Sequence, residues 1–191
     1  MKSTHAARCD LNTAVNAARA FAQLTKDYFS QVPRDPKAAE IFVGRTRGAF
    51  TAATTNIALS VELLLKAEAV LHKMTVLHTH DLRQLFDHLP REAQDRIEKN
   101  YEARVPSAIA GFGGMQIAVT TTPIPPTEAE LSSARQSLVS VKDLKSLLSA
   151  ERDAFETWRY LFAEGHVGRV AVFVSYFRRL EAVAEFLEAD I

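Results

Sequence analysis

The sequence predicts an all-α protein, built as an antiparallel up-and-down bundle of about five to six helices with one long loop. Three observations lead to this prediction. Every long periodic segment repeats its apolar residues at helical spacing, and only residues 116–122 have the composition of a β-strand. Residues 56–74 carry two apolar stripes, which is typical of a helix that packs on two sides at the centre of a bundle.

The central stretch, residues 56–74, is expected to be the inner part of one long helix. A narrow polar strip lies between its apolar stripes and includes Glu62 and Lys66, which are spaced for an i,i+4 ion pair. The strip also contains Thr51, Thr55 and Lys73. The two apolar stripes consist of Ile57, Val61, Leu64, Leu65 and Leu71, and of Leu59, Leu63, Ala67, Val70 and Met74.

Ahead of the central stretch, a loose tail of residues 1–8 leads into a first helix whose apolar periodicity is ended by a proline. Asp35 is placed to cap a second helix, and the proline after it suits the first helical position because its missing N–H needs no partner there. We expect this second helix to continue to residue 74. Its two glycines, Gly44 and Gly48, predict a kink or break in the first third.

A short helix and a charged surface helix follow the central stretch. Thr79 is placed to cap the short helix, and Pro90 ends it. Residues 91–104 are strongly charged, so this helix is expected to touch the core through a thin stripe that contains Ile97 and Tyr101. The residues of the short helix predicted to be buried are Leu82, Leu85, Phe86 and Leu89.

A long loop is predicted at residues 105–127, which carry no charge but contain glycines, threonines and prolines. The loop exceeds the roughly 12 to 15 residues usual inside a compact domain, so it is either a functional lid or an insertion without a role. Residues 116–122 within it either pair as a short hairpin or lie partly disordered. The glycines and prolines exclude a membrane span at this position.

The remaining chain is predicted to form three helices, at residues 127–151, 154–166 and 167–189. The last helix carries apolar residues on two flanks. A second apolar flank predicts a symmetric homodimer, because an exposed apolar patch of that size is unusual on a monomer. The flank facing the core consists of Val170, Phe173, Val174, Phe177, Leu180, Ala184 and Leu187, and the second flank consists of Val172, Tyr176, Val183 and Phe186.

Composition limits the class of protein. A chain of 191 residues with 47% hydrophobic content suits a single domain, here residues 1–191. The 23 basic and 23 acidic residues give a net charge of zero, so no overall field attracts nucleic acid or an anionic membrane. The single cysteine, Cys9, forms no intramolecular disulfide, and the first residues lack an apolar signal sequence. We therefore expect a cytoplasmic protein without a membrane partner.

Metal and nucleotide sites are not predicted. Residues 111–114, GFGG, lack the spacing of a dinucleotide or Walker loop. The densest group of metal-ligand types has no His-x-x-x-His or Cys-x-x-Cys pairing to organise it, so capping and surface roles explain it more simply. We therefore expect no metal and no cofactor. That group consists of His72, His78, His80, His88, Asp81 and Asp87.

Two arginine–histidine pairs are the candidates for catalysis. Arg83 and His88 are five residues apart, which turns them about 140° from each other on a regular helix. Arg159 and His166 are seven apart, nearly two full turns, so they share a helix face or meet across a turn. The second pair is therefore the preferred site. An equally simple interpretation of Arg159 is an ion pair with a neighbouring glutamate.

Three motifs together resemble the HEPN superfamily of small prokaryotic helical domains, across about residues 55 to 190. They are residues 60–67 (SVELLLKA), residues 80–86 (HDLRQLF) and residues 158–160 (WRY). The resemblance implies an antiparallel four-to-five-helix bundle, usually a symmetric dimer. In active members it also implies an Arg-x4-6-His motif just before the last helix. Arg159 and His166, with six residues between them, are similar in spacing and place, and Tyr160 follows the arginine where active members usually carry a polar residue.

The resemblance implies a metal-independent ribonuclease. A histidine can take the proton of an RNA 2′-hydroxyl, and a guanidinium can stabilise the charge that develops on the phosphate, giving a cyclic phosphate and a 5′-hydroxyl. Glu62 resembles the acidic residue that lines the HEPN cleft, where it would orient Arg159; the alternative is a simple pair with Lys66. Tyr160 would also line the cleft.

The sequence leaves several functions open. The leading hypothesis is a HEPN-type RNA endonuclease that serves as a toxin or defence component, with RNA and an antitoxin or other protein as candidate partners. The alternative is a non-catalytic HEPN module that binds RNA, a nucleotide or a protein, and a structural assembly protein is the third class. Secondary candidates for the site are Arg83, His88 and His80.

Overall fold

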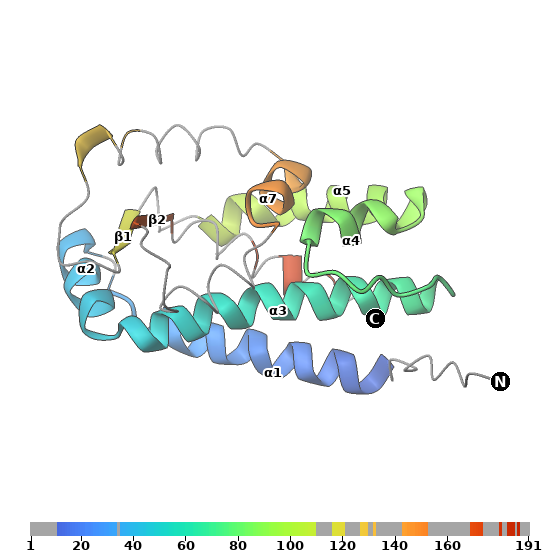
Figure 1. The fold of residues 1–191 in the computed structure, drawn as a ribbon, viewed down its shortest axis with the longest axis horizontal. Helices are drawn as coiled ribbons and strands as arrows, with labels where there is room; N and C mark the ends of the chain where they lie inside the picture. Colours follow the sequence, from blue (N-terminus) through green and yellow to red (C-terminus); the bar gives the residue numbers. More distant parts are fainter. Residues whose placement is uncertain are drawn as a thin grey trace.

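The structure is a computed structural model, and most of the residues that it describes are helical, as predicted. The helices are α1 (Leu11–Ser30), α2 (Pro36–Arg45), α3 (Arg47–Leu71), α4 (Leu82–His88), α5 (Arg91–Ile109) and α7 (Leu144–Ala150), and the strands are β1 (Gln116–Thr120) and β2 (Arg169–Phe173) (Figure 1). The described residues are 11–33, 35–109, 116–120, 127–129, 132, 143–152, 169–173, 180, 183–185 and 187.

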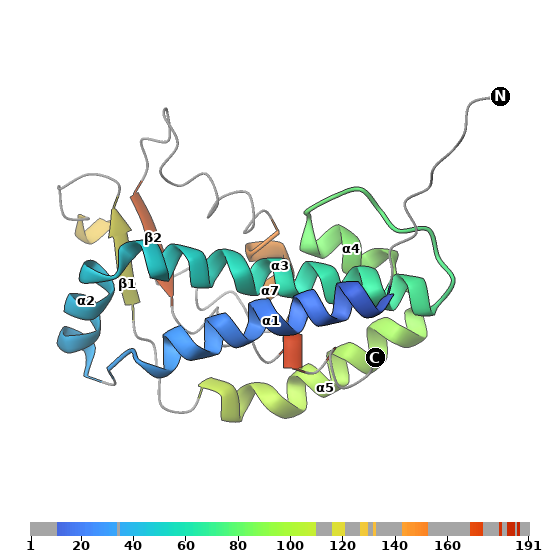
Figure 2. The same ribbon diagram turned by 90° about the horizontal axis from the view of Figure 1, so that it is seen from below.

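Helices α1 and α3 lie side by side and run in opposite directions, with α2 at the turn between them (Figures 1 and 2). Small residues and hydroxyls bring the two backbones together. The Thr25 hydroxyl donates to the Ala53 carbonyl at 2.9 Å, and the Ser60 hydroxyl donates to the Ala18 carbonyl at 2.9 Å. All four residues are buried, so these bonds fix the pairing of the helices where water is excluded.

The predicted long second helix is broken into α2 and α3 at Thr46, between the two glycines, which confirms the expected break. Asp35 caps α2 as predicted, and its carboxylate accepts from the Ala38 N–H at 2.8 Å. The helix ends at Leu71 rather than at residue 74, and Leu71 is 42% exposed, so its assignment to a buried stripe was wrong. A residue at the last helical position has no following turn to cover it.

Two boundaries after α3 differ from the prediction. Asp81, rather than Thr79, caps α4: its carboxylate accepts from the Gln84 N–H at 2.9 Å, because aspartate placed directly before the first turn reaches that donor. Helix α5 continues to Ile109, so the first residues of the expected loop 105–127 are helical. Pro106 removes one backbone hydrogen bond, but Ala103 before it and Ala108 after it favour the helix.

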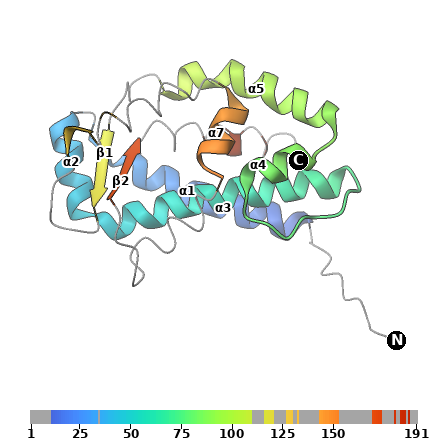
Figure 3. The same ribbon diagram turned by 45° about the horizontal axis from the view of Figure 1, so that its top comes forward.

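A two-stranded antiparallel ribbon interrupts the helical architecture beside α2 (Figure 3). Gln116 pairs with Phe173 and Thr120 with Arg169, so β1 pairs with a strand distant in sequence instead of forming a local hairpin. The prediction of a helix over residues 167–189 was therefore wrong at residues 169–173. The sequence RVAVF is rich in β-branched residues, and its strand preference is realised once a partner strand is present.

The predicted helix 127–151 is also divided. Asp143 has an extended backbone and caps α7, its carboxylate accepting from the Ser146 N–H and hydroxyl, both at 2.7 Å. This strong cap explains why a new helix begins there. The predicted helix at residues 154–166 lies outside the described residues.

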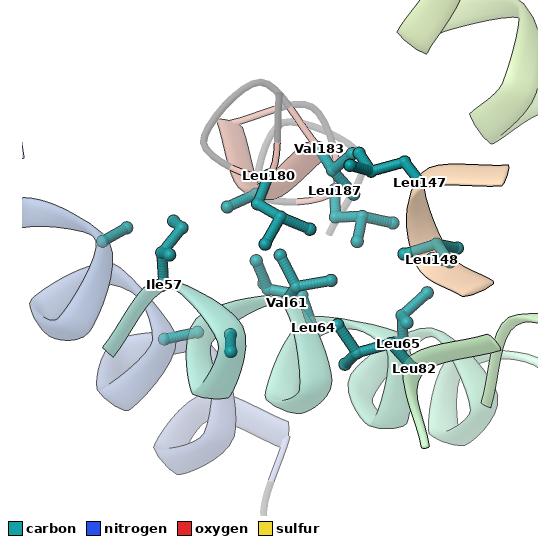
Figure 4. Packing of buried hydrophobic residues seen from close by; sticks show 14 of the residues in the cluster. Ile57, Val61, Leu64, Leu65, Leu82, Leu147, Leu148, Leu180, Val183 and Leu187 are labelled. Carbon is teal, nitrogen blue, oxygen red and sulfur yellow. The ribbon is translucent and has the colours of Figure 1, made fainter. Parts of the chain in front are cut away.

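The core lies on α3, between α1, α4, α7 and the helical residues near the C-terminus (Figure 4). Leu180, Ala184 and Leu187 are buried, as predicted for the inner flank of the last helix. Val183 is buried as well and faces Leu147 of α7, so it is not part of an exposed patch (Figure 4). Val172 lies in β2, so it does not belong to a helical flank together with Val183.

Residues Gly48–Leu71 are also long and apolar enough to cross a membrane by length and composition alone. Of the 18-residue window within this helix that meets these criteria, 56% is buried inside the protein. The helix therefore serves as the core of the fold, an arrangement compatible with a soluble protein.

Candidate functional site

The polar strip of α3 contains a buried carboxylate. Glu62, on the predicted polar strip, is only 2% exposed. Lys66 contacts its Oε1 atom at 2.6 Å, which confirms the predicted i,i+4 pair. His80 contacts the other oxygen, Oε2, through Nδ1 at 2.9 Å. Each oxygen of Glu62 thus holds one basic side chain, and we call Glu62, Lys66 and His80 the Glu62 cluster.

The segment of residues 72–81 connects α3 to α4 (Figure 2). This segment brings His80 to Glu62. Lys73 turns the chain out of α3 with a positive φ of 57°, a conformation that side-chain-bearing residues adopt rarely. His88 then fixes the middle of the segment by donating from Nε2 to the Thr75 carbonyl at 2.9 Å. The segment is therefore held at both its centre and its end.

Asp81 anchors the end of this segment. While its Oδ1 atom caps α4, its Oδ2 atom contacts Arg152, which follows α7, at 2.8 Å. The backbone N–H of Leu82 also donates to the Arg152 carbonyl at 3.2 Å. Because Asp81 is fixed by two elements, the adjacent His80 has little freedom to leave Glu62.

The Glu62 cluster combines a fixed proton carrier with a cation. A carboxylate accepts hydrogen bonds only, so the Nδ1 atom of His80 carries the proton that faces Glu62. The buried carboxylate holds the ring in one orientation. The His80 side chain is 45% exposed and the Lys66 side chain 17% exposed, whereas that of Glu62 is 3% exposed. The proton-carrying ring thus reaches solvent while its orienting group does not.

Arg83 and His88, the less favoured of the two arginine–histidine pairs, contact different neighbours. Arg83 contacts Asp87 at 2.7 Å and donates to the Lys145 carbonyl at 3.2 Å and the Ser149 hydroxyl at 3.3 Å. His88 instead contacts the segment that follows α3. The two side chains therefore brace α4 against separate elements, in keeping with their predicted divergence on the helix.

Arg159, His166 and Tyr160, the residues predicted from the family motif, lie outside the described residues. Their assignment stays a prediction, as does the expected contact between Glu62 and Arg159.

The histidines of residues 72–88 do not gather at one point. His72 approaches Glu68 at 3.5 Å, His80 contacts Glu62, and His88 contacts a backbone carbonyl. Among the described residues, no group of three histidine, cysteine or acidic side chains is placed to hold a metal ion.

A second buried carboxylate was not predicted from the sequence. Glu68, fully buried on α3, contacts Arg96 on α5 at 3.0 Å. The two residues are 28 positions apart, so no local spacing rule predicts their contact. The only available signal was a glutamate at an otherwise apolar position of the central helix, where a buried charge requires a partner.

No protein-family model matches the chain, and neither a curated protein nor a solved structure matches it. The likeness to the HEPN superfamily is therefore carried by the three sequence motifs.

Proposed function

We propose that this chain is a HEPN-type helical domain that cleaves RNA without a metal ion. The observation that carries the proposal is the Glu62 cluster, in which a buried carboxylate on the central helix holds a histidine and a lysine toward solvent. Proton transfer and charge stabilisation are the two tasks that metal-free cleavage of a phosphodiester requires. A glutamate at this position also belongs to the motif SVELLLKA on which the resemblance depends.

Arg159 and His166 are the proposed catalytic pair. His166 takes the proton of the 2′-hydroxyl, whose oxygen attacks the adjacent phosphorus, and Arg159 stabilises the charge that develops on the phosphate oxygens. The bond from phosphorus to the 5′-oxygen breaks, leaving a 2′,3′-cyclic phosphate and a 5′-hydroxyl. Tyr160 lines the same cleft in this proposal.

Cleavage of single-stranded RNA in the presence of EDTA tests the proposal. Wild-type protein is expected to cut, while His166→Ala lowers the rate by about 10² to 10⁴ and Arg159→Ala is nearly as damaging. Arg83→Ala and His88→Ala are the matched controls, since they remove the same two residue types from a pair that braces α4. The assignment fails if wild type is inactive, or if His88→Ala is inactive while His166→Ala cuts normally.

A non-catalytic binding module is the second candidate. Tyr160 favours it, because active members of the superfamily usually carry a polar residue after the arginine. In that case the protein binds RNA, a nucleotide or a protein partner without turnover. Filter binding with labelled RNA, measured beside the cleavage assay, separates the two: retention of uncut RNA by both wild type and His166→Ala identifies the binding module.

The proposed assembly is a cytoplasmic homodimer that acts as a toxin or defence component, with an antitoxin or other protein as regulator. The HEPN resemblance supports this assembly. Light scattering at micromolar concentration tests it, and a monomer mass contradicts it. A total interface above roughly 1,000 Å² is expected for a stable dimer.

A further inference from the structure

Helix α2 has an exposed face that carries two positive charges. Lys37, Ile41, Gly44 and Arg45 are all exposed, and their spacing places them along one side of the helix. We call these four residues the outer face of α2. Within the part of the chain that the structure describes, neither Lys37 nor Arg45 forms an ion pair, and the outer face contains no acidic residue. Both cations are therefore available to an anionic partner.

The opposite side of α2 holds the helix in place at the turn between α1 and α3 (Figures 1 and 2). Ala39 and Val43 are buried in the core. The Thr46 hydroxyl, directly after the helix, donates to the Phe42 carbonyl at 2.8 Å and forms a hydrogen bond with the Tyr28 hydroxyl of α1, also at 2.8 Å. Because these contacts fix the helix, its outer face can bind a partner without first being ordered.

The outer face of α2 fits the backbone of a single-stranded RNA. Lys37 and Arg45 are eight residues apart, about 12 Å along a helix, so they can contact separate phosphate groups. Ile41 lies between them and is 57% exposed, which offers an apolar contact to riboses and bases. A Cβ atom built at Gly44 meets nothing within 4 Å, so the space beside Arg45 is open to a close approach.

An anionic membrane fits the same face less well. Membrane-surface helices insert a broad apolar side into the lipid and keep their basic residues at the headgroups. In α2 the apolar residues Ala39 and Val43 are buried in the core instead, and Ile41 is the large hydrophobic residue that this helix exposes. One isoleucine buries too little apolar surface for insertion, whereas phosphate contacts need no insertion.

We propose that the outer face of α2 is a docking surface for the sugar–phosphate backbone of single-stranded RNA. This inference rests on RNA as the partner in the proposed function. Lys37 and Arg45 each neutralise one phosphate, and Ile41 contacts the sugars or bases between them. The net charge of the chain is zero, so attraction comes from these local charges and not from an overall field. Phosphate contacts carry no sequence information, so docking at this face is independent of base sequence.

The salt dependence of binding tests the proposal. The probe is a labelled 2′-O-methyl oligouridine, which lacks the attacking 2′-hydroxyl and therefore stays intact in the presence of an active ribonuclease. Fluorescence anisotropy gives the binding constant over a series of KCl concentrations. Each phosphate contact on a single strand contributes about 0.7 to the slope of log K against log salt concentration. Lys37→Gln and Arg45→Gln are each expected to reduce the slope by about 0.7, and the double variant by about 1.4.

Matched variants separate the outer face from general effects of charge and folding. Lys99→Gln removes the same charge at an exposed position of α5 and is expected to keep the wild-type slope. Lys37→Arg and Arg45→Lys keep the charges and are expected to keep the slope as well. Ile41→Ala is expected to weaken binding several-fold at every salt concentration without changing the slope, because it removes no charge. Circular dichroism melts verify that each variant is folded.

The outcomes distinguish this inference from the proposed catalysis, which is measured separately as cleavage of unmodified RNA in EDTA. If wild type cuts RNA but the double variant Lys37→Gln, Arg45→Gln keeps the wild-type slope, only the inference is overturned. If the slope falls as expected and no RNA is cut, catalysis fails and the docking surface stands.

Three further results would overturn the docking surface. The first is a wild type that does not bind the oligonucleotide. The second is an equal loss of slope in Lys99→Gln and Lys37→Gln, which would indicate a diffuse attraction instead of a defined face. The third is a double variant that loses binding to phosphatidylserine vesicles but retains the oligonucleotide, which would assign the outer face of α2 to a membrane.

Discussion

One guanidinium nitrogen of Arg96, on α5, donates hydrogen bonds to both carboxylate oxygens of Glu68 on α3, at 3.0 and 3.1 Å. Glu68 is completely buried, whereas the Arg96 side chain is 40% exposed. The strongly charged helix α5 is thus held to the central helix by an ion pair in addition to its stripe of apolar contacts. That stripe consists of Ala93, Ile97 and Tyr101, all buried.

Arg96→Met is expected to lower the free energy of unfolding by about 2 to 4 kcal/mol. Methionine keeps most of the apolar stem but removes the guanidinium charge, and loss of a cation contact is costly for a buried carboxylate. The exposure of Arg96 places this figure toward the lower part of the usual range for a buried pair. Urea unfolding followed by circular dichroism measures the change.

Arg91→Met is the matched control, because Arg91 lies on the same helix and its ion pair with Asp95 is exposed. It is expected to change stability by less than about 0.5 kcal/mol. In a double-mutant cycle, Glu68→Gln combined with Arg96→Met should cost less than the sum of the two single changes, since the two residues contact each other directly. Strict additivity would contradict a direct coupling between the two residues.

Alanine at Gly44 or Gly48 is expected to stabilise the protein by about 0.3 to 1 kcal/mol each. Both glycines lie in helices, and a Cβ atom built at either position meets nothing within 4 Å. The break at Thr46 therefore does not depend on a glycine conformation. Thermal unfolding of the two variants measures the effect. A lower melting temperature would mean that the glycines are needed for the break between α2 and α3.

Local signals in the sequence predicted most of the helical elements. Asp35 was identified as a cap because the motif is complete within four residues, and Ile57, Val61 and Leu64 were assigned to the core from their spacing alone. The strand at residues 169–173 was missed because its apolar residues satisfy helical spacing too. Pairing with β1, about 50 residues earlier in the chain, decides between the two, and no local pattern encodes that contact.

In the candidate site, too, the local contact was predicted and the contact between distant residues was not. The contact between Glu62 and Lys66 follows from i,i+4 spacing and was predicted. The contact between Glu62 and His80 depends on the path of the segment after α3, so the sequence identified both residues without joining them. The burial of Glu62 was missed for the same reason, since a helical pattern does not reveal which loop covers its polar strip.

Ser60→Ala is expected to destabilise the protein by about 0.5 to 1.5 kcal/mol. The Ser60 hydroxyl donates to the Ala18 carbonyl across the interface of α1 and α3, where both residues are buried. Ser30→Ala provides the comparison, because its hydroxyl bonds to the Asp27 carbonyl at an exposed position. Equal losses in the two variants would show that the contact between the helices adds nothing beyond local propensity.

Glu151, at the C-terminal end of α7, gives the protein a predictable pH dependence. Burial raises the pKa of its carboxyl from 4.5 to about 7. Below pH 4.5 the folded and unfolded states both hold the proton, so the residue costs no stability there. As the pH rises from 4.5 toward 7, the unfolded state releases its proton first, and unfolding becomes progressively more favourable. The loss of stability caused by Glu151 is complete above pH 7.

Glu151→Gln should therefore stabilise the protein at pH 8 by about 1 to 3 kcal/mol and have little effect at pH 4.5, because glutamine stays neutral throughout. Melting temperatures of wild type and variant at pH 4.5, 6 and 8 test this, and the difference should widen with pH. Glu185→Gln is the control, since the Glu185 side chain is 47% exposed and contacts Lys26 at the surface. A pH-independent difference for Glu151→Gln would mean that the carboxyl is ionised in the folded protein across this range, with water or a cation reaching it at the end of α7.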